Sequence, residues 1–283
     1  MNILMAEAFN MDTLNNISTG NVYLVGGGPG DPELLTVKAL RLIQTADVIV
    51  YDALITDEIM ALSNPASEKI YVGKVANRHT LAQDEINLLL VKLAQQGKSI
   101  CRLKGGDPYI FGRGGEEALT LSQHNIPYEV IPGITAAAAC SAATGIPLTH
   151  RDYAQSLQFV TGHCKNKQGL ANDNQAGQVD WQSLASANQT LVVYMGILRS
   201  PDIKLNLINH GRSADTPIAI VEKGTRPDQR VVIGTLSELD TLVKQHQIGS
   251  PALIIIGEVV NLYTQLNQLD QDELITEVFT QAA

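Results

Sequence analysis

The sequence predicts an α/β protein of two domains, the first built on a mostly parallel sheet and the second on a mixed sheet. From residue 21 onward, short runs that are apolar almost throughout alternate with segments of helical periodicity, which is typical of parallel strands covered by helices on both faces. The turn-rich stretch GIPLTHRDYAQS interrupts this alternation near residues 147–155. Beyond it, two apolar runs are separated only by TRPDQ, which is too short for a helical crossover and therefore indicates antiparallel pairing.

The first half is expected to alternate strands with helices. The expected strands are NVYLVG, DVIVYD, EKIYVG, SICRLKGG and YEVIPG, and the expected helices cover residues 33–44, 81–96 and 115–124 and an alanine-rich segment that ends at Gly145. The helix over residues 81–96 is amphipathic and is ended by Gly97, a residue that commonly stops helices.

The second half is expected to hold strands at LQFVTGH, TLVVYMG, PIAIVEKG, RVVIGTL and ALIIIGEVV, and helices at 180–187, 201–210 and 237–245. Residues 164–178 have the composition of an exposed loop. We therefore predict an N-terminal extension over residues 1–20, an N-terminal domain over 21–150, a C-terminal domain over 151–264 and an acidic tail over 265–283.

Composition limits the class of protein and of partner. With 283 residues, 45% of them hydrophobic and 17% charged, the chain is long and apolar enough for two globular domains. A formal charge of -9 argues against nucleic acid as the main partner, because phosphate backbones need a basic surface. It leaves room for an acidic small molecule bound by a local cluster of arginines.

Neither a membrane span nor a metal framework is expected. The segment GITAAAACSAATGIPL is short for a membrane span and predicts a close-packed helix. No Lys or Arg precedes Lys38, so we predict a cytoplasmic location and no secretory signal. Cys101, Cys140 and Cys164 show no C-x-x-C spacing, so we interpret all three as packing residues.

The first loop, YLVGGGPGDPELLT, differs from a dinucleotide fingerprint. Gly26 and Gly28 have the spacing of the G-x-G-x-x-G motif, but Asp31 stands where its last glycine belongs. A carboxylate beside the start of a helix would repel a pyrophosphate. The loop is therefore expected to serve a ligand of another kind.

Candidate chemistry lies at the carboxyl ends of the predicted strands, where open parallel sheets bind ligands. In the glycine-rich stretch KGGDPYIFGRGGEE, Arg113 and Glu116 lie one helical turn apart, either beside a ligand or as a surface pair on a glycine-capped helix. Asp52 is a candidate general acid or base, or a turn residue before a helix that starts at Thr56. Lys74 follows the next strand, either handling protons jointly with Asp52 or simply solvated.

Many of these motifs match one known family. The stretches VGGGPGDPELLT, DVIVYD, GK at residues 73–74, RLKGGDPYIFGRGGEE, VIPGITAAAA, GIPLTHR, YMG and PIAIVEKGTRPDQ closely resemble those of the uroporphyrinogen-III C-methyltransferases of the tetrapyrrole methyltransferase family. The resemblance runs from about residue 22 to 259. It implies two α/β domains of the tetrapyrrole methyltransferase (class III) type, with S-adenosylmethionine in the cleft between them, in a homodimer.

The resemblance also implies roles for individual residues. The implied cofactor contacts are Pro29, Gly105, Gly106, Asp107, Ile110, Thr135, Ala136, Met195 and Gly224. Asp52 and Lys74 match a proton acceptor and a proton donor. Arg113, Glu116 and Arg151 match catalytic or substrate-binding groups, Met195 also contacts substrate, and Arg78 is a further candidate for the substrate's carboxylates. No metal ligand is implied.

The implied reaction is the transfer of two methyl groups to C2 and C7 of uroporphyrinogen III, which gives precorrin-2 for sirohaem or cobalamin, and S-adenosylhomocysteine. The alternatives are a methyltransferase for a later cobalamin precursor, a nicotinamide oxidoreductase, and a cofactor-binding sensor without activity. Gly27 in place of a more usual alanine and a long 164–178 segment are small departures. We expect oxidation and metal insertion, the work of a fused second half in bifunctional relatives, to be done elsewhere.

Overall fold

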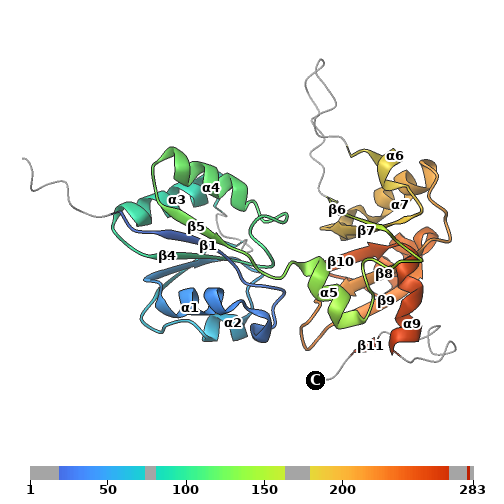
Figure 1. Ribbon diagram of the computed structural model, residues 1–283, viewed down its shortest axis with the longest axis horizontal. Coiled ribbons are helices and arrows are strands. Elements are labelled where there is room, and N and C mark those ends of the chain that lie inside the picture. The colour runs from blue at the N-terminus through green and yellow to red at the C-terminus, as the bar shows by residue number, and fades with distance from the viewer. Residues whose placement is uncertain (1–18, 74–80, 163–178, 268–278, 281–283) are drawn as a thin grey trace, which may run out of the picture.

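The computed structural model describes residues 19–73, 81–162, 179–267 and 279–280, which form two lobes (Figure 1). Each lobe is a β-sheet with helices on both faces. The chain passes from the first lobe to the second between strand β5 (Tyr128–Ile131) and helix α5 (Ala136–Thr144). The α/β class with one parallel and one mixed sheet is thus confirmed.

The first sheet has the strand order β3-β2-β4-β1-β5, and every neighbouring pair in it is parallel. Its other strands are β1 (Val22–Gly26), β2 (Val48–Tyr51), β3 (Glu68–Tyr71) and β4 (Ile100–Lys104). Because β1 and β4 lie in the interior of the sheet, their carboxyl ends meet at its centre. The loops that follow these two strands are therefore neighbours.

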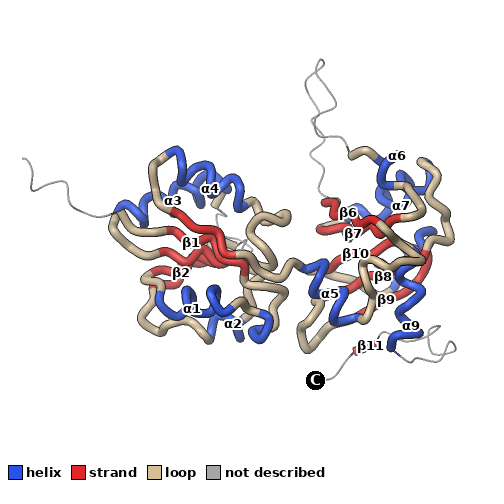
Figure 2. Tube along the Cα trace, in the orientation of Figure 1, coloured by secondary structure: helices blue, strands red, loops and turns tan. Residues whose placement is uncertain are grey.

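Helices cover both faces of this sheet (Figure 2). They are α1 (Val37–Thr45), α2 (Asp57–Ala61), α3 (Gln83–Gln95) and α4 (Gly114–Gln123). Along β1, Leu24 packs in a cluster with residues of α3 and α4, while the next residue, Val25, packs with residues of α1 and α2. This alternation follows from the two-residue period of a strand and explains why the strands are apolar almost throughout.

The second sheet has the order β11-β9-β8-β10-β7-β6 and is mixed. Its strands are β6 (Ser156–Thr161), β7 (Gln189–Tyr194), β8 (Pro217–Glu222), β9 (Arg230–Thr235), β10 (Ala252–Ile256) and β11 (Phe279–Thr280). Only the β6–β7 pair is parallel among the described pairs. The antiparallel pairing expected across TRPDQ is confirmed between β8 and β9.

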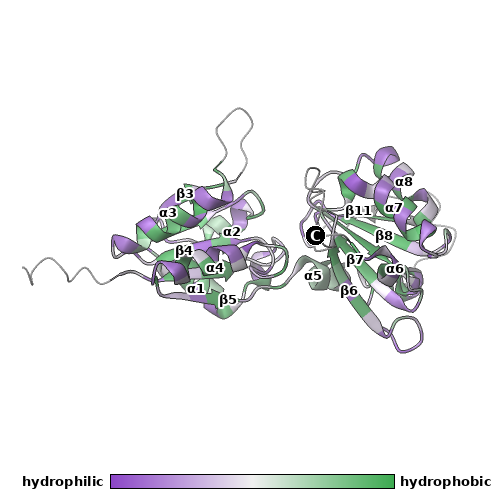
Figure 3. Cartoon of the chain, turned by 90° about the horizontal axis from the view of Figure 1, so that it is seen from above, coloured by the Kyte–Doolittle hydropathy of each residue, from purple (hydrophilic) through white to green (hydrophobic). Residues whose placement is uncertain are grey.

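The faces of the second sheet carry different helices. One face packs against α5 and α9 (Leu262–Asn267), and the other against α6 (Trp181–Leu184), α7 (Ser200–Asn209) and α8 (Leu239–Gln245). Figure 3 shows hydrophobic strands in this lobe beside helices with hydrophilic outer surfaces. Although α5 precedes residue 147 in the chain, its buried residues belong to the core of the second sheet. The boundary expected at residues 147–155 stays a prediction.

Several element boundaries differ from the sequence prediction by a few residues, and in two of them a single residue explains the difference. The helix expected over residues 33–44 is split into a 3-10 turn (Pro32–Leu34) and α1, because the Thr36 side chain accepts a hydrogen bond from the Ala39 N–H and caps α1 there. The strand expected through GEVV ends at Ile256, since Gly257 has a φ of 146° and a 3-10 turn (Glu258–Asn261) follows.

Candidate active site

The loops after β1 and β4 are paired through two glycines. The Gly28 N–H donates to the Gly106 carbonyl at 3.1 Å, and the Gly106 N–H donates to the Gly28 carbonyl at 2.6 Å. Both glycines have a φ of 67°, a conformation that other residues rarely adopt. Pro29 and Gly105, two of the expected cofactor contacts, are the chain neighbours of this pair.

Asp107 joins the β4 loop to the loop after β5. Its carboxylate accepts hydrogen bonds from the Tyr109 N–H at 2.8 Å and from the Gly133 N–H at 3.1 Å. A Cβ at Gly133 would lie 2.3 Å from the Gly106 carbonyl oxygen, so the backbones there are in contact. Asp107 was expected to be a cofactor contact; in the structure its carboxylate braces the two loops.

The amino end of α5 is held by a tyrosine from the end of β7. The Tyr194 hydroxyl lies 2.6 Å from Thr135 Oγ1 and accepts a hydrogen bond from the Ala137 N–H at 3.0 Å. Burial raises the pKa of this hydroxyl above its usual value, so it stays protonated at neutral pH. Met195 follows Tyr194 directly in the chain, at the carboxyl end of β7.

The remaining expected cofactor contacts lie around the same helix. Ile110 packs in the apolar cluster that includes α5, and the neighbouring Phe111 ring lies 4.8 Å from the Tyr194 ring, centroid to centroid. A Cβ at Gly224 would lie 2.4 Å from the sulfur of Cys140 in α5. The loops that carry Gly105, Gly106, Asp107 and Thr135 thus meet between the carboxyl ends of the first sheet and the amino end of α5, while Gly224 lies against the middle of that helix.

Strained backbone marks the same region. Among the described residues, the non-glycine residues with a positive φ in the site loops are Phe111, Arg113, Met195, Lys223 and Thr225. Such conformations cost of order 1–3 kcal/mol each and persist where the surroundings hold them, often at ligand sites. Sequence reasoning singled out neither Phe111 nor Thr225, since no residue type signals this strain.

Asp52 lies at the carboxyl end of β2. One carboxylate oxygen, Oδ1, accepts a hydrogen bond from the Leu54 N–H at 3.1 Å, as in a turn, and the other, Oδ2, faces Arg102 Nη2 at 3.6 Å. The Asp52 side chain is 25% exposed and that of Arg102 only 3%. Both interpretations of Asp52 therefore have a structural basis. Lys74, its expected partner, and Arg78 lie outside the described residues.

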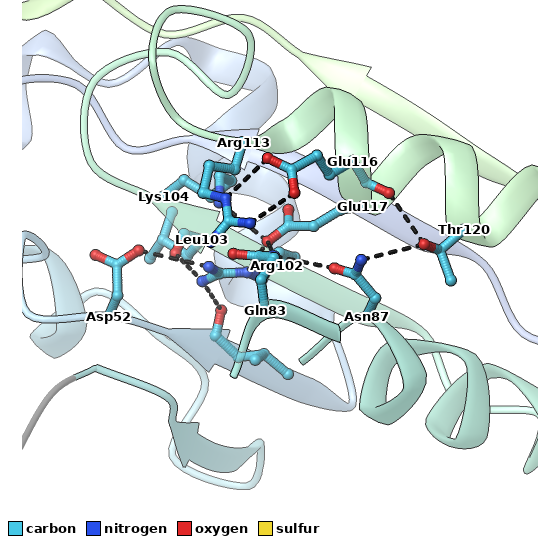
Figure 4. A network of polar contacts seen from close by, with 11 residues as sticks. Asp52, Gln83, Asn87, Arg102, Leu103, Lys104, Arg113, Glu116, Glu117 and Thr120 are labelled. Carbon is cyan, nitrogen blue, oxygen red and sulfur yellow. Dashed lines mark hydrogen bonds and ion pairs between the residues drawn. The ribbon is translucent and has the colours of Figure 1, made fainter. Parts of the chain in front are cut away.

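Arg102, Lys104 and Glu117 form a buried charged cluster that the sequence analysis did not single out (Figure 4). Arg102 Nε and Lys104 Nζ both lie 3.0 Å from Glu117 Oε1. Burial is the largest influence on the Lys104 amine and lowers its pKa. The sequence signal that could have revealed this cluster is the presence of two cationic residues, Arg102 and Lys104, inside the otherwise apolar strand SICRLKGG.

The expected substrate-binding arginines are exposed. Arg113 forms a two-point ion pair with Glu116 at 2.8 and 2.6 Å, and this hydrogen bond raises the arginine's pKa. Arg151 is exposed in a turn closed by the pairing of His150 with Ala154. Within the part of the chain that the structure describes, no hydrogen bond or ion pair joins Arg151 to another candidate.

A pocket of about 760 Å³ lies between the lobes, beside these residues. It is lined by the loops after β1, β2 and β8, and by Ala143 of α5. Arg226 spans it, since its Nη2 donates to the Leu54 carbonyl at 3.0 Å. The pocket walls include the neighbours of Pro29 and Gly224 but none of the nine expected contacts, so the pocket is adjacent to the expected site and does not coincide with it.

The described residues hold no cluster of three His, Cys, Asp or Glu side chains placed for a metal ion. No helix in the same ranges is long and apolar enough to cross a membrane. Cys101 and Cys140 are buried and unbridged, and Cys164 lies outside the described residues.

Residues 21–240 match the family model of the tetrapyrrole (corrin/porphyrin) methylases. The chain belongs to this family. The methylase is 56% identical over 248 residues to a siroheme synthase of Pseudoalteromonas translucida, and 55% identical over 262 residues to one of Nitrosomonas europaea. These matches cover 88% and 93% of the chain but 51% and 53% of the relatives, so the chain spans about half the length of the curated relatives it matches.

Solved structures of methyltransferases have the same fold as the methylase. The uroporphyrin-III C-methyl transferase of Thermus thermophilus, solved with S-adenosyl homocysteine, is 41% identical, with a TM-score of 0.70 over 86% of this chain and 94% of that one. A cobalt precorrin-4 methyltransferase is 28% identical, with a TM-score of 0.72 over 85% of this chain and 95% of that one.

The odd glycine loop now has a structural explanation. In the methylase, Asp31 caps the 3-10 turn, because its Oδ1 accepts a hydrogen bond from the Glu33 N–H at 2.8 Å. The carboxylate thus occupies the position at which a dinucleotide enzyme would receive its pyrophosphate. Family membership and this cap both disfavour the nicotinamide alternative.

Proposed function

We propose that the chain catalyses the S-adenosylmethionine-dependent C-methylation of uroporphyrinogen III at C2 and C7, giving precorrin-2. The observation that carries this proposal is the convergence of the loops after β1, β4 and β5 and the end of β7 on the amino end of α5, with the loop that follows Asp52 packed against Gly105. The likeness to a uroporphyrin-III methyltransferase at 41% identity favours this substrate over a later precorrin.

The glycine loops fit S-adenosylmethionine. At Gly106 a Cβ would be in ordinary contact with the Ala136 nitrogen at 3.8 Å, so this position needs a glycine for its φ of 67°, which lets the loop backbone pass close to α5. Bound there, the cofactor supplies an activated methyl group on its sulfonium. The residues that would hold it are Pro29, Gly105, Gly106, Asp107, Ile110, Thr135, Ala136, Met195 and Gly224.

Positioning is the main task of the surrounding residues. A sulfonium is already a reactive methyl donor, so catalysis requires the pyrrole carbon in line with the methyl group and water excluded. The exposed Met195 and the ring of Phe111 offer apolar contact for a macrocycle. Both have a positive φ, a strained backbone conformation that persists where the surroundings hold it, often at ligand sites.

Asp52 is proposed as the acceptor of the proton that the methylated pyrrole carbon must lose. Its carboxylate is three-quarters buried, faces Arg102, and is fixed by the Leu54 N–H. The donor role of Lys74 stays a proposal from the resemblance alone.

The eight carboxylates of the substrate need cationic partners. Arg113 and Arg151 are proposed to bind them, with Met195 contacting the ring. Because Arg113 is paired with Glu116, a substrate carboxylate has to share or replace that partner. Glu116 is therefore proposed to act on turnover through Arg113.

Three further points remain proposals. The protein is proposed to act as a homodimer, as its resemblance to the family implies, and in the cytoplasm, as the lack of Lys or Arg before Lys38 suggests. Its product is proposed to feed the sirohaem or cobalamin branch. Sirohaem synthesis as a whole, the activity for which the longer relatives are named, is not assigned to this half-length chain.

The test is an oxygen-free incubation with uroporphyrinogen III and S-adenosylmethionine, followed by product mass. We expect a gain of two methyl groups that requires the cofactor. Cofactor binding without methylation would reject the substrate and favour a later precorrin. Asp52→Ala should lower turnover more than cofactor affinity, whereas Gly106→Val should weaken cofactor binding first; equal losses of affinity would contradict these roles.

A further inference from the structure

Glu117 of α4 is fully buried, yet it is charged and central to a polar network (Figure 4). Its Oε1 atom receives Arg102 Nε and Lys104 Nζ, each at 3.0 Å, and also the Gln83 side chain at 3.2 Å. Among the described residues, its second oxygen, Oε2, accepts no hydrogen bond.

Stability alone does not explain such a cluster. Buried ion pairs lose their hydration, and well-packed apolar residues in their place are often neutral or stabilising. The cluster also has an underused oxygen, a cost that native interiors usually avoid. Its position suggests another role, because Arg102 lies in β4 directly beside β2, which carries Asp52 at its carboxyl end.

The Arg102 guanidinium is held on three sides. Its Nε donates to Glu117, and its Nη1 donates to the Leu103 carbonyl at 3.2 Å and to the Val50 carbonyl at 3.4 Å. The remaining nitrogen, Nη2, faces Asp52 Oδ2 at 3.6 Å. Because the guanidinium is planar and rigid, fixing Nε and Nη1 also fixes the direction in which Nη2 points.

Glu117 is itself fixed by the packing of α3 on α4. Gln83 donates to Asn87 at 2.9 Å as well as to Glu117, and Asn87 donates to Thr120 at 3.1 Å. These side chains join the two helices one turn from Glu117. The carboxylate is thus a fixed anchor and not a mobile counter-ion.

The charges in the cluster also point toward Asp52. Arg102 and Lys104 carry two positive charges against the single carboxylate of Glu117, so one positive charge is left over. The nearby carboxylate that balances it is Asp52. The pKa of Lys104 is lowered first by burial and then by Arg102, as expected where cations are crowded.

We propose that Glu117 is a positioning residue, which anchors Arg102 so that its guanidinium holds the Asp52 carboxylate at the edge of the site. This inference rests on the proposed function, in which Asp52 accepts the proton. Glu117 does not touch substrate; it acts through Arg102. Small displacements of such a group are costly, since about 1 Å of misplacement can lower a rate by about 100-fold.

The first experiment compares Glu117→Gln with Asp240→Asn as a matched control. Asp240 is also a carboxylate that contacts two cations, Lys204 and Lys244, but it lies on α8, remote from the site. We expect Glu117→Gln to lower kcat by about tenfold with little change in the affinity for S-adenosylhomocysteine, and Asp240→Asn to leave kcat within about twofold. A Glu117→Gln enzyme that is less stable but has the wild-type kcat would overturn the inference.

A double-mutant cycle then separates positioning from simple structure. Measured in single turnovers with excess enzyme, Glu117→Gln should cost about tenfold in the wild-type background but less than about twofold in Asp52→Asn, because its effect passes through Asp52. The same loss in both backgrounds would overturn the inference. A wild-type protein that does not methylate would instead reject the proposed function.

A crystal structure provides a readout that needs no activity. The variant is Glu117→Gln or, if that protein does not fold, Lys104→Met/Glu117→Leu, which removes one charge of each sign. We expect Arg102 to move away from Asp52 while the Gly28–Gly106 pairing is kept. An unmoved Arg102, still facing Asp52 Oδ2 as in the wild type, would refute the anchoring role of Glu117.

Discussion

Replacing Tyr194 by phenylalanine would test how the end of β7 holds the amino end of α5, where Thr135 and Ala136 are proposed cofactor contacts. The hydroxyl is the one atom of the side chain that reaches both Thr135 and the Ala137 N–H, at 2.6 and 3.0 Å. Tyr194→Phe keeps the ring and its contact with Phe111 but removes both hydrogen bonds. It leaves a buried N–H near the amino end of α5 without an acceptor.

The magnitude follows from that unpaired N–H. Leaving a buried donor unsatisfied costs about 1–3 kcal/mol, so we expect the free energy of unfolding to fall by about 2 kcal/mol. For a protein of 283 residues that corresponds to a Tm lower by roughly 3–4 °C. Since Thr135 and Ala136 are proposed cofactor contacts, a part of that energy, about 1.4 kcal/mol, would weaken S-adenosylhomocysteine binding by about tenfold.

The assay is urea unfolding together with calorimetric titration of S-adenosylhomocysteine. Tyr23→Phe is the control, because Tyr23 lies in β1 and its hydroxyl makes no hydrogen bond within the described ranges. The control should change neither quantity. If Tyr194→Phe loses stability but binds the product as tightly as the wild type, the link between this hydroxyl and the cofactor loops is wrong.

Three further outcomes follow from the structure. Gly133→Ala should weaken S-adenosylhomocysteine binding by at least about tenfold in a calorimetric titration, because its Cβ would lie 2.3 Å from a backbone oxygen. A Cβ at Gly115 would have no neighbour within 4 Å, so the control variant Gly115→Ala should bind S-adenosylhomocysteine as tightly as the wild type. Equal affinities of the Gly133→Ala and Gly115→Ala variants would refute this account. Burial raises the pKa of Cys101 and of Cys140 to about 12, so both thiols should stay protonated and resist alkylation at pH 8 in the native protein. Alkylation followed by mass spectrometry measures this, and labelling of the native protein as fast as of the protein unfolded in urea would contradict it. The hydrogen bond with Lys204 lowers the pKa of Asp240 below its usual 3.8, so its stabilisation is present above that pH and is lost as the pH falls through the lowered value. Asp240→Asn should therefore reduce the free energy of unfolding at pH 7 by up to about 1 kcal/mol. If the difference in unfolding free energy between wild type and variant stayed constant as the pH fell below 3.8, this explanation would be wrong.

Local patterns were sufficient for most elements of the fold. The inner strands of the first sheet, β1, β2 and β4, were predictable because they are short, mostly apolar runs between turn residues, and the antiparallel β8–β9 pair followed from the length of TRPDQ. Predictions were poorer where one residue's backbone or side chain decides the boundary. Thr36 delays the start of α1, and Gly257 ends β10 early.

The sequence by itself determined the α/β class, the glycine loops and the family, because these depend on residue types at short, fixed spacings. Only the tertiary structure decided which side chains meet. It places Tyr194 against Thr135, although 59 residues separate them, and Glu117 against Arg102 beneath Asp52. A charged residue in a strand has no local signature for its partner, since the partner is set by strand order and helix packing. The position of the Asp52 carboxylate therefore depends on contacts that no segment of the chain encodes alone.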